Sequence, residues 1–472
     1  MPHIATDICV IGAGSGGLSV AAGAVQMGAR VVLIEGAEMG GDCLNAGCVP
    51  SKALIAAAKA AEAQRKGFRG VAAVEPRVDF ATVKDHVAAV IARIAPVDSQ
   101  ERFEGLGCTV IRAMARFTGP REVQAGDHAI RARRFVIATG SRPVVPPISG
   151  IEAVPILTNE TVFALRERPA HLIVLGGGPI GVEMAQAHRR LGCEVTVLEA
   201  AKILGREDPE AAAMVAAQLK AEGIALLEGQ PVVRLAGSAG AIEATLGDGT
   251  QVRGSHLLVA VGRKVALDGL GLDAAGIAHG PGGISVTQAL RSTTNRRVYA
   301  VGDAAGGLQF THVAGWHAGI VVRQIVLGLP ARADPRAIPR VTYTDPELAQ
   351  VGLTEAEARQ AHGASLAVVR ADLDHNDRAQ TEGRASGFAK VMVVKGRAVG
   401  ATIVGPQAGE LIGLWALAIG ARLKLSAIAG MVAPYPTLGE VSKRAAGAYF
   451  TPRLFGNPLL RRIVRLVQAW VP

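Results

Sequence analysis

Residues 8–17 read Ile-Cys-Val-Ile-Gly-Ala-Gly-Ser-Gly-Gly, and this stretch decides the fold of the first part of the chain. The uncharged apolar run predicts a buried strand, and the G-x-G-x-x-G pattern after it leads into an alanine-rich helix that ends near Gly28. A second apolar strand, residues 30–34, ends at Glu35. This order of strand, glycine loop, helix, strand and acidic residue is typical of a dinucleotide-binding βαβ unit.

Each motif position has a physical role in such a unit. Gly12 makes the tight turn, Gly14 lets the backbone approach a pyrophosphate, and Gly17 allows the helix to pack closely on the strand. The carboxylate of Glu35 is placed to accept a hydrogen bond from a ribose hydroxyl.

The same unit occurs a second time. Residues 171–175 form an apolar strand that runs into a glycine loop at Gly176, Gly178 and Gly181, and the next strand, 194–198, ends at Glu199. Two dinucleotide folds in one chain imply two bound dinucleotides.

Two cysteines follow the first unit. Cys43 and Cys48 are separated by four residues, and Pro50 suits the first turn of a helix beginning near Cys48. A helix N-terminus favours a thiolate, and Lys52 adds a positive charge one turn later. We interpret the pair as a redox dithiol; the alternative is two buried structural cysteines.

Together these motifs resemble the flavin-dependent pyridine nucleotide-disulfide oxidoreductases, which include dihydrolipoamide dehydrogenase, mercuric reductase and glutathione reductase. The likeness extends to about residue 450. It implies an α/β fold of two Rossmann-like domains plus an α+β dimerisation domain. It also implies an enzyme that passes electrons between NAD(P)H, FAD, the Cys43–Cys48 disulfide and a small disulfide or thiophilic substrate, in a homodimer whose active site is shared across the interface.

The resemblance also assigns residues. Residues 138–143, 298–304 and 343–352 match the exit from the flavin domain, the second flavin motif and the start of the dimerisation domain. Catalytic roles are implied for Cys43, Cys48, Lys52, Glu183, Tyr435 and Glu440, with Lys52 paired to Glu183 beside the flavin. The implied FAD contacts are Gly12, Gly14, Gly17, Glu35, Lys52, Thr139, Gly140, Ser141, Gly302, Asp303 and His312. The implied nicotinamide-nucleotide contacts are Gly176, Gly178, Gly181, Glu183, Glu199, Val232 and Gly262, and no metal site is predicted.

The expected domain boundaries follow from the positions of these motifs. Residues 1–148 and 266–336 form the FAD domain, with a long helix from Phe80 to about Glu104. Residues 149–265 form the NAD(P) domain. Residues 337–472 form the interface domain, with strands near 366–371, 388–395 and 398–404.

One position departs from the family pattern. Members that exchange dithiols use a histidine, supplied by the other subunit, in a His-Pro-Thr-x-x-Glu segment; here residues 435–440 keep Glu440 but begin with Tyr435. A tyrosine with a pKa near ~10 is a poor base at neutral pH compared with imidazole at about 6.5. Tyrosine here resembles mercuric reductase, so metal-ion reduction is an alternative function. The chain lacks that enzyme's C-terminal cysteine pair, because its last cysteine is Cys193.

The nicotinamide preference depends on Glu199. An acid at this position bonds the ribose diol and repels a 2′-phosphate, and two alanines follow it. We therefore expect NAD(H) to be preferred over NADP(H).

Composition sets further bounds. Five cysteines in 472 residues argue against a secreted disulfide scaffold and favour a reducing compartment, so we expect a cytoplasmic protein. Cys9, Cys108 and Cys193 are expected in the core. The net charge of +10 reflects a basic tail, with no acidic residue after Glu440, so a nucleic-acid partner is not expected. Residues 8–29 are long enough to mimic a membrane span, but their glycines favour strand, turn and helix.

The basic tail, about 453–472, predicts an amphipathic helix capped at Asn457 and started by Pro458. Two interpretations stay open: the helix packs on its own dimer, or it contacts a membrane surface or a partner protein. A function of another class is also open, namely a nicotinamide-sensing flavoprotein dimer that acts through this tail.

Overall fold

The computed structural model describes residues 2–471 and divides them into two compact units. The first unit contains the residues up to Gly176, Ala187–Ala200 and Gln230–Asp334. The second contains Gly177–Gln186, Ala201–Gly229 and the residues from Pro335 onward. The domain boundaries expected from the sequence stay predictions.

A seven-stranded sheet organises the first unit. Strands β3, β2, β1, β6 and β19 pair in parallel, and β6, β5 and β4 continue the sheet as an antiparallel meander. The strand bounds are β1 His3–Ile11, β2 Val31–Glu35, β3 Thr109–Arg112, β4 Ala115–Gly119, β5 Glu122–Ala125, β6 His128–Ile137 and β19 Val298–Ala300.

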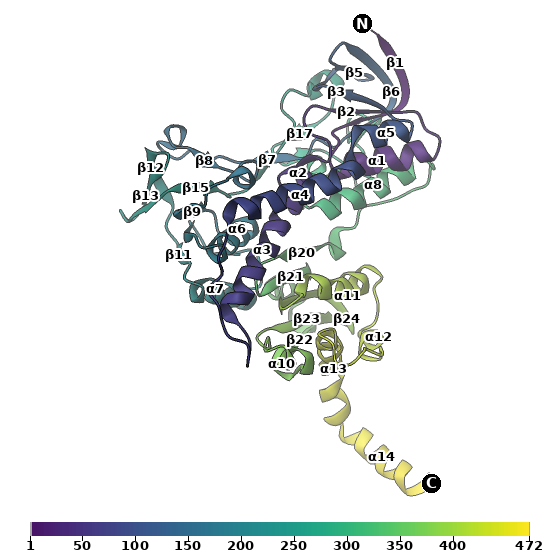
Figure 1. The fold of residues 1–472 in the computed structure, drawn as a ribbon. Coiled ribbons are helices and arrows are strands. Elements are labelled where there is room, and N and C mark those ends of the chain that lie inside the picture. Colours follow the sequence, from purple (N-terminus) through teal and green to yellow (C-terminus); the bar gives the residue numbers. More distant parts are fainter. Residues whose placement is uncertain (1, 472) are drawn as a thin grey trace. The chain divides into compact units, whose positions relative to one another are not determined.

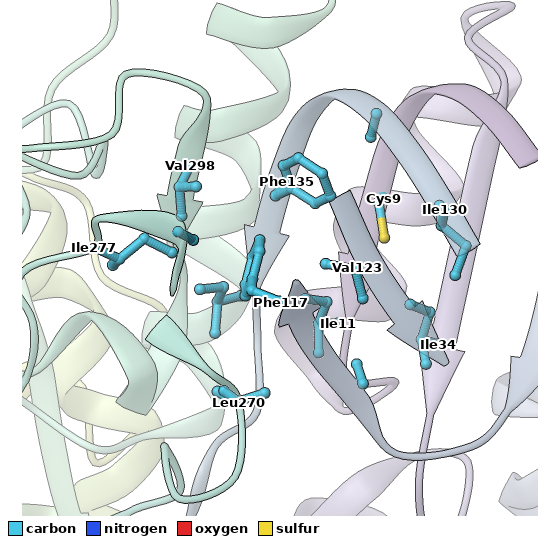
Figure 2. Packing of buried hydrophobic residues seen from close by; sticks show 14 of the residues in the cluster. Cys9, Ile11, Ile34, Phe117, Val123, Ile130, Phe135, Leu270, Ile277 and Val298 are labelled. Carbon is cyan, nitrogen blue, oxygen red and sulfur yellow. The ribbon is translucent and has the colours of Figure 1, made fainter. Parts of the chain in front are cut away.

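Both faces of this sheet are buried, which explains the uninterrupted apolar runs of β1 and β2. Cys9 and Ile11 point into one core cluster, while Ile8 and Val10 point into the other, as the two-residue period of a strand requires. Figure 2 shows the first cluster, where the rings of Phe117 and Phe135 lie 5.2 Å apart in an edge-to-face arrangement.

Helices cover the sheet and carry the cysteine segment. Helix α1 and helix α8 contribute to the second cluster, and the short helix α2 precedes α3. The bounds are α1 Ser15–Gln26, α2 Gly41–Asn45, α3 Cys48–Lys66, α4 Phe80–Asp98, α5 Gln100–Gly105 and α8 Thr311–Ile325. The predicted single helix from Phe80 to Glu104 is wrong in one respect. The observed helix α4 ends at Asp98. The chain breaks there because Ser99 is extended and its hydroxyl accepts a hydrogen bond from the Arg102 N–H as the N-cap of α5.

The second dinucleotide fold has the strand order β10, β9, β15 and β8, all parallel. The first unit also contains small antiparallel sheets: β12–β13–β14, β7 with β16, and β17 with β18. The bounds are β7 Ser141–Pro143, β8 Ile156–Leu157, β9 His171–Leu175, β10 Glu194–Glu199, β12 Val232–Ser238, β13 Ala241–Leu246, β14 Gln251–Gly254, β15 His256–Val259, β16 Arg263–Val265, β17 His279–Gly280 and β18 Gly283–Ile284; helix α6 spans Pro179–Arg190.

The second unit is built on a five-stranded antiparallel sheet, in the order β20, β21, β24, β23 and β22 (Figure 1). Its core centres on the fully buried Trp415, whose indole N–H donates to the Ser442 hydroxyl at 3.1 Å. The bounds are α7 Pro209–Ala221, β11 Ala225–Glu228, β20 Pro339–Thr342, β21 Glu347–Gly352, α9 Glu355–His362, β22 Leu366–Asp372, α10 Asp377–Thr381, β23 Phe388–Val394, β24 Arg397–Gly405, α11 Ala408–Gly420, α12 Leu425–Ala429, α13 Glu440–Phe455 and α14 Pro458–Trp470. The three strands predicted in this region are confirmed.

Two further expectations can be compared with the structure. Cys9, Cys108 and Cys193 are buried, as predicted, and burial raises the pKa of each thiol. Within residues 2–471, no helix has the length and apolar character needed to cross a membrane. Residues 8–29 form β1, a loop and α1 instead.

Candidate active site

The two cysteines lie on consecutive helices. Cys43 belongs to the single turn α2, Cys48 is the first residue of α3, and Ala46 and Gly47 separate the helices. Both are free thiols, Cys43 half-buried and Cys48 exposed. The predicted helix start at Cys48 is confirmed, so its sulfur lies where the helix dipole favours negative charge.

The pair is electrostatically asymmetric. A hydrogen bond from the Cys43 thiol lowers the pKa of Cys48 to about 6, with further support from the Thr311 hydroxyl, 3.3 Å from the Cys48 sulfur, and from the charge of Lys52. The hydrogen bond between the two sulfurs has the opposite effect on Cys43: the Cys48 sulfur raises the pKa of Cys43, and burial adds to that rise. One sulfur therefore carries the charge while the other keeps its proton.

Two glycines of the first glycine loop leave no room for a side chain. Gly12 has a φ of +103°, and a Cβ there would meet the Ala138 carbonyl oxygen at 2.4 Å. A Cβ on Gly17 would lie 1.8 Å from the Gly12 carbonyl oxygen. Gly14 is the N-cap of α1 and offers no side-chain cap, so the helix N–H groups are left for an anion such as a pyrophosphate.

Glu35 lies at the end of β2, as predicted, and it also stabilises the loop. Its carboxylate accepts hydrogen bonds from the backbone N–H groups of Ala13 and Ala37 at 2.5 and 2.7 Å. Each carboxylate oxygen has a second lone pair, so the group is still able to accept a ribose hydroxyl.

Residues 138–143 and 298–304, the two later segments assigned to FAD by the resemblance, meet through a buried polar network. The Ser141 hydroxyl donates to the Asp303 carboxylate at 2.5 Å, and Arg263 donates to both the hydroxyl and the carbonyl oxygen of Ser141 at 2.8 Å. Arg263 also lies 3.2 Å from the carboxylate of Asp42, the residue before Cys43. Burial raises the pKa of Asp303, against the hydrogen bond from Ser141.

Two observations show that these residues fit FAD. The buried hydroxyl of Thr139 has no hydrogen-bond partner within residues 2–471, although it directly precedes the turn at Gly140. At Gly12 and Gly17 neighbouring backbone fills the space that a Cβ would need, so the loop presents bare backbone to a pyrophosphate.

Gly302 donates its N–H to the buried His317 at 3.2 Å, whereas the predicted contact His312 stacks on Phe310 with ring centroids 5.2 Å apart.

The second glycine loop has the same close backbone contact at its first glycine as the first loop. A Cβ on Gly176, at φ +110°, would meet the Ala260 carbonyl oxygen at 2.5 Å, while Gly178 has open space. Gly181 lies in the first turn of α6, Glu199 ends β10, Val232 begins β12, and Gly262 precedes β16 at φ +135°.

The second unit holds the remaining predicted residues. The exposed Tyr435 donates its hydroxyl proton to the Asp377 carboxylate at 2.7 Å, and this interaction raises the pKa of the tyrosine. Glu440 begins α13 and accepts a hydrogen bond from the Thr437 N–H at 3.5 Å. Glu183 accepts from the Tyr343 N–H at 2.8 Å, and its pairing with Lys52 stays a prediction.

Comparison with known proteins agrees with this geometry. Residues 6–318 match the family described as pyridine nucleotide-disulphide oxidoreductase, and residues 338–446 match its dimerisation domain. The chain belongs to the pyridine nucleotide-disulphide oxidoreductase family. It is therefore an NAD(P)H-dependent flavoprotein disulfide oxidoreductase, and the matched dimerisation domain supports a homodimer.

The similar proteins have several different names. The chain is 34% identical over 460 residues to a mercuric reductase of Streptomyces lividans, covering 95% of this chain and 97% of the relative. It is 35% identical over 454 residues to a dihydrolipoyl dehydrogenase of Thermus scotoductus, covering 94% and 97%. Among solved structures, a Cu(II) complex of the HOCl-induced flavoprotein disulfide reductase RclA of Escherichia coli has a TM-score of 0.83 and 30% identity, covering 93% of this chain and 99% of the other.

Three residues that contact the candidate residues were not predicted from the sequence. Thr311 lies 263 positions from Cys48, and Arg263 lies 122 positions from Ser141, so neither contact belongs to a local motif. Asp377 was missed because its partner, Tyr435, is 58 positions away. Arg263 directly follows Gly262, a predicted nicotinamide-nucleotide contact, and this adjacency was the signal available in the sequence.

Proposed function

We propose that the chain uses NADH to reduce a small disulfide or another small thiophilic substrate through the Cys43–Cys48 pair. The observation that carries the proposal is the placement of the two sulfurs. Cys48 is exposed at the first residue of α3 with its sulfur 3.3 Å from the Thr311 hydroxyl, and the half-buried Cys43 precedes it on α2. This placement lowers the pKa of Cys48 and raises that of Cys43. Reactive cysteines are low-pKa thiols that solvent reaches, whereas structural cysteines are buried and inert.

The proposed reaction balances as a two-electron transfer. A hydride from NADH and one proton from solvent convert the Cys43–Cys48 disulfide to the dithiol and release NAD⁺. FAD, when bound, supplies the two-electron exchange between nicotinamide and disulfide. The dithiol then exchanges with a substrate disulfide through a mixed disulfide, which returns Cys43 and Cys48 to the oxidised form and releases two thiols.

We assign the cofactor contacts as the resemblance implied them. The first glycine loop, Glu35, Thr139, Ser141 and Asp303 would hold FAD, and the second loop with Glu199, Val232 and Gly262 would hold the nicotinamide nucleotide. Lys52 and Glu183 would form an ion pair beside the flavin. The preference for NADH rests on Glu199, because its negative charge disfavours a 2′-phosphate.

A second candidate function is the reduction of a soft metal ion. The observation that favours it is Tyr435, whose proton is held by Asp377 and whose raised pKa leaves it unable to act as a base at neutral pH. Two soft sulfurs suit a soft, reducible ion such as Hg(II). Two electrons from NADH would reduce Hg(II) to the element and release NAD⁺ and one proton.

The test is NADH oxidation by the purified FAD-loaded protein with lipoamide or Hg(II) as acceptor, in the unmodified chain and in C48S, Y435H and Y435F. Loss of turnover in C48S with either acceptor supports the dithiol route, and full turnover in C48S contradicts it. Fast lipoamide turnover in the unmodified chain supports disulfide reduction. Slow lipoamide turnover that rises in Y435H but not in Y435F, together with sustained Hg(II) turnover, favours the metal ion.

A further inference from the structure

The last helix, α14, is not explained by the enzyme's chemistry. It spans Pro458–Trp470, and the Asn457 side chain accepts hydrogen bonds from the N–H groups of Leu459 and Leu460 at its start. The predicted tail helix and its cap are therefore confirmed. It lies beyond the matched dimerisation domain, which ends at residue 446.

Helix α14 has separate apolar and basic faces. At roughly 100° per residue, the apolar side chains occupy an arc of about 160°. These side chains are Leu459, Leu460, Ile463, Val464, Leu466, Val467 and Trp470, and Val471 follows the helix. The opposite arc carries Arg461, Arg462, Arg465 and Gln468. A two-stranded coiled coil needs only a narrow a/d seam, so the width of this face suits a surface better than a single partner helix.

Its own unit leaves this apolar face uncovered. None of the side chains of α14 is buried, and Ile463, Leu466 and Trp470 are 45%, 60% and 83% exposed. The end of α13 adds Phe455 at 67%. Within the second unit, α14 leads away from the sheet and from helices α11 and α12 (Figure 1). Contiguous exposed apolar surface of this kind marks an interaction site.

Charge decides which partner fits this surface. After Glu440 the sequence has six lysines and arginines and no acidic residue, and half of these cations are the three arginines of α14. A second copy of the helix would bring like charges together with no carboxylate to pair them. A surface of anionic lipid headgroups supplies the missing negative charge and an apolar layer below it. Trp470 at the last turn suits the boundary between the two layers.

We infer that α14 binds the surface of an anionic lipid bilayer, with its apolar face in the headgroup boundary and its arginines on the lipid phosphates. The enzyme would then be held at a membrane surface by a peripheral helix. This inference is independent of which substrate the dithiol reduces.

The test is co-sedimentation of the full-length FAD-loaded protein with vesicles made of equal parts phosphatidylcholine and phosphatidylglycerol, compared with vesicles of phosphatidylcholine alone. Three variants probe the helix: deletion of residues 457–472, the apolar-face variant I463S/V467S, and the charge variant R461Q/R462Q/R465Q. A matched control, R69Q/R121Q/R296Q, removes the same charge from exposed arginines elsewhere.

We expect the unmodified protein and the matched control to sediment with the anionic vesicles and not with phosphatidylcholine. Each of the three helix variants should weaken that binding by roughly tenfold or more, while NADH oxidation in solution is unchanged. Equal sedimentation of the deletion variant overturns the inference. So does an unmodified protein that stays in solution, or one that binds both vesicles equally. Loss of the dimer in the deletion variant without any vesicle binding overturns it in favour of packing on a second copy.

Discussion

Replacing Thr311 with valine tests how the structure lowers the pKa of Cys48. The side chains have nearly the same shape, but valine lacks the hydroxyl that lies 3.3 Å from the Cys48 sulfur. A hydrogen bond to a charged group contributes about 1.5–3 kcal/mol, and an exposed sulfur acceptor places this one at the low end. One pKa unit corresponds to about 1.4 kcal/mol, so the pKa of Cys48 should rise by about one unit.

The consequence is a pH-dependent loss of reactivity. Because a thiol reacts as the thiolate, which forms as pH rises through its pKa, a midpoint moved from about 6 toward ~7 lowers the reactive fraction about fivefold near pH ~6 and barely changes it near pH ~8. The assay is the rate of iodoacetamide modification of the reduced protein against pH, with fragment mass spectrometry locating the label on Cys48. T311S keeps the hydroxyl and is the matched control. An unchanged midpoint in T311V, or an equal shift in T311S, would refute the reasoning.

Three further substitutions have expected outcomes. R263M removes both hydrogen bonds to Ser141 and should raise the FAD dissociation constant about tenfold, measured by flavin fluorescence; a dissociation constant equal to that of the unmodified chain would contradict this. Lys84 is 2% exposed, donates to the Val162 carbonyl at 3.0 Å, and burial lowers its pKa from 10.5 to about 8. Below that pKa the folded state bears a cost for the charged form, so K84M should stabilise the protein near pH ~7 by about 1–2 kcal/mol, and the gain should fade as pH rises from about 8 toward ~10.5. A rise in the thermal midpoint of K84M that stays the same between about pH 8 and ~10.5 would count against this explanation. E199S should raise the ratio of kcat/KM for NADPH to that for NADH about tenfold, and an unchanged ratio in steady-state kinetics would remove Glu199 as the source of the proposed NADH preference.

The sequence predicted local structure well because its signals were local. The glycine loops, the strand ends at Glu35 and Glu199, and the start of α3 at Cys48 each depend on residues within one βαβ unit or one turn. The break at Ser99 was missed because a single serine does not interrupt the helical spacing of the apolar residues around it. Its effect depends on the hydrogen bond that the hydroxyl accepts from a backbone N–H, which the sequence pattern does not show.

The electrostatics of the site was less predictable, because it comes from residues far apart in the chain. The helix dipole and Lys52 were visible in the sequence as causes of a low pKa at Cys48, but the larger contributions come from the Cys43 thiol and the Thr311 hydroxyl. The network from Asp42 through Arg263 to Ser141 likewise needs three separate segments to converge. Only the fold brings these groups within hydrogen-bonding distance.

The protonation of the two sulfurs bears on the substrate. Under the proposed function, the Cys43 proton must leave when the Cys43–Cys48 disulfide re-forms from the mixed disulfide. Tyr435 would be a poor acceptor for that proton because Asp377 raises the tyrosine pKa further. A soft metal ion needs no such base, since binding to a thiol itself expels the proton. Reduced metal also leaves without a proton, whereas each departing thiolate of a disulfide substrate takes one up. If the proposed function holds, tyrosine at position 435 penalises dithiol exchange selectively, and the ratio of metal to disulfide turnover should fall when histidine replaces it.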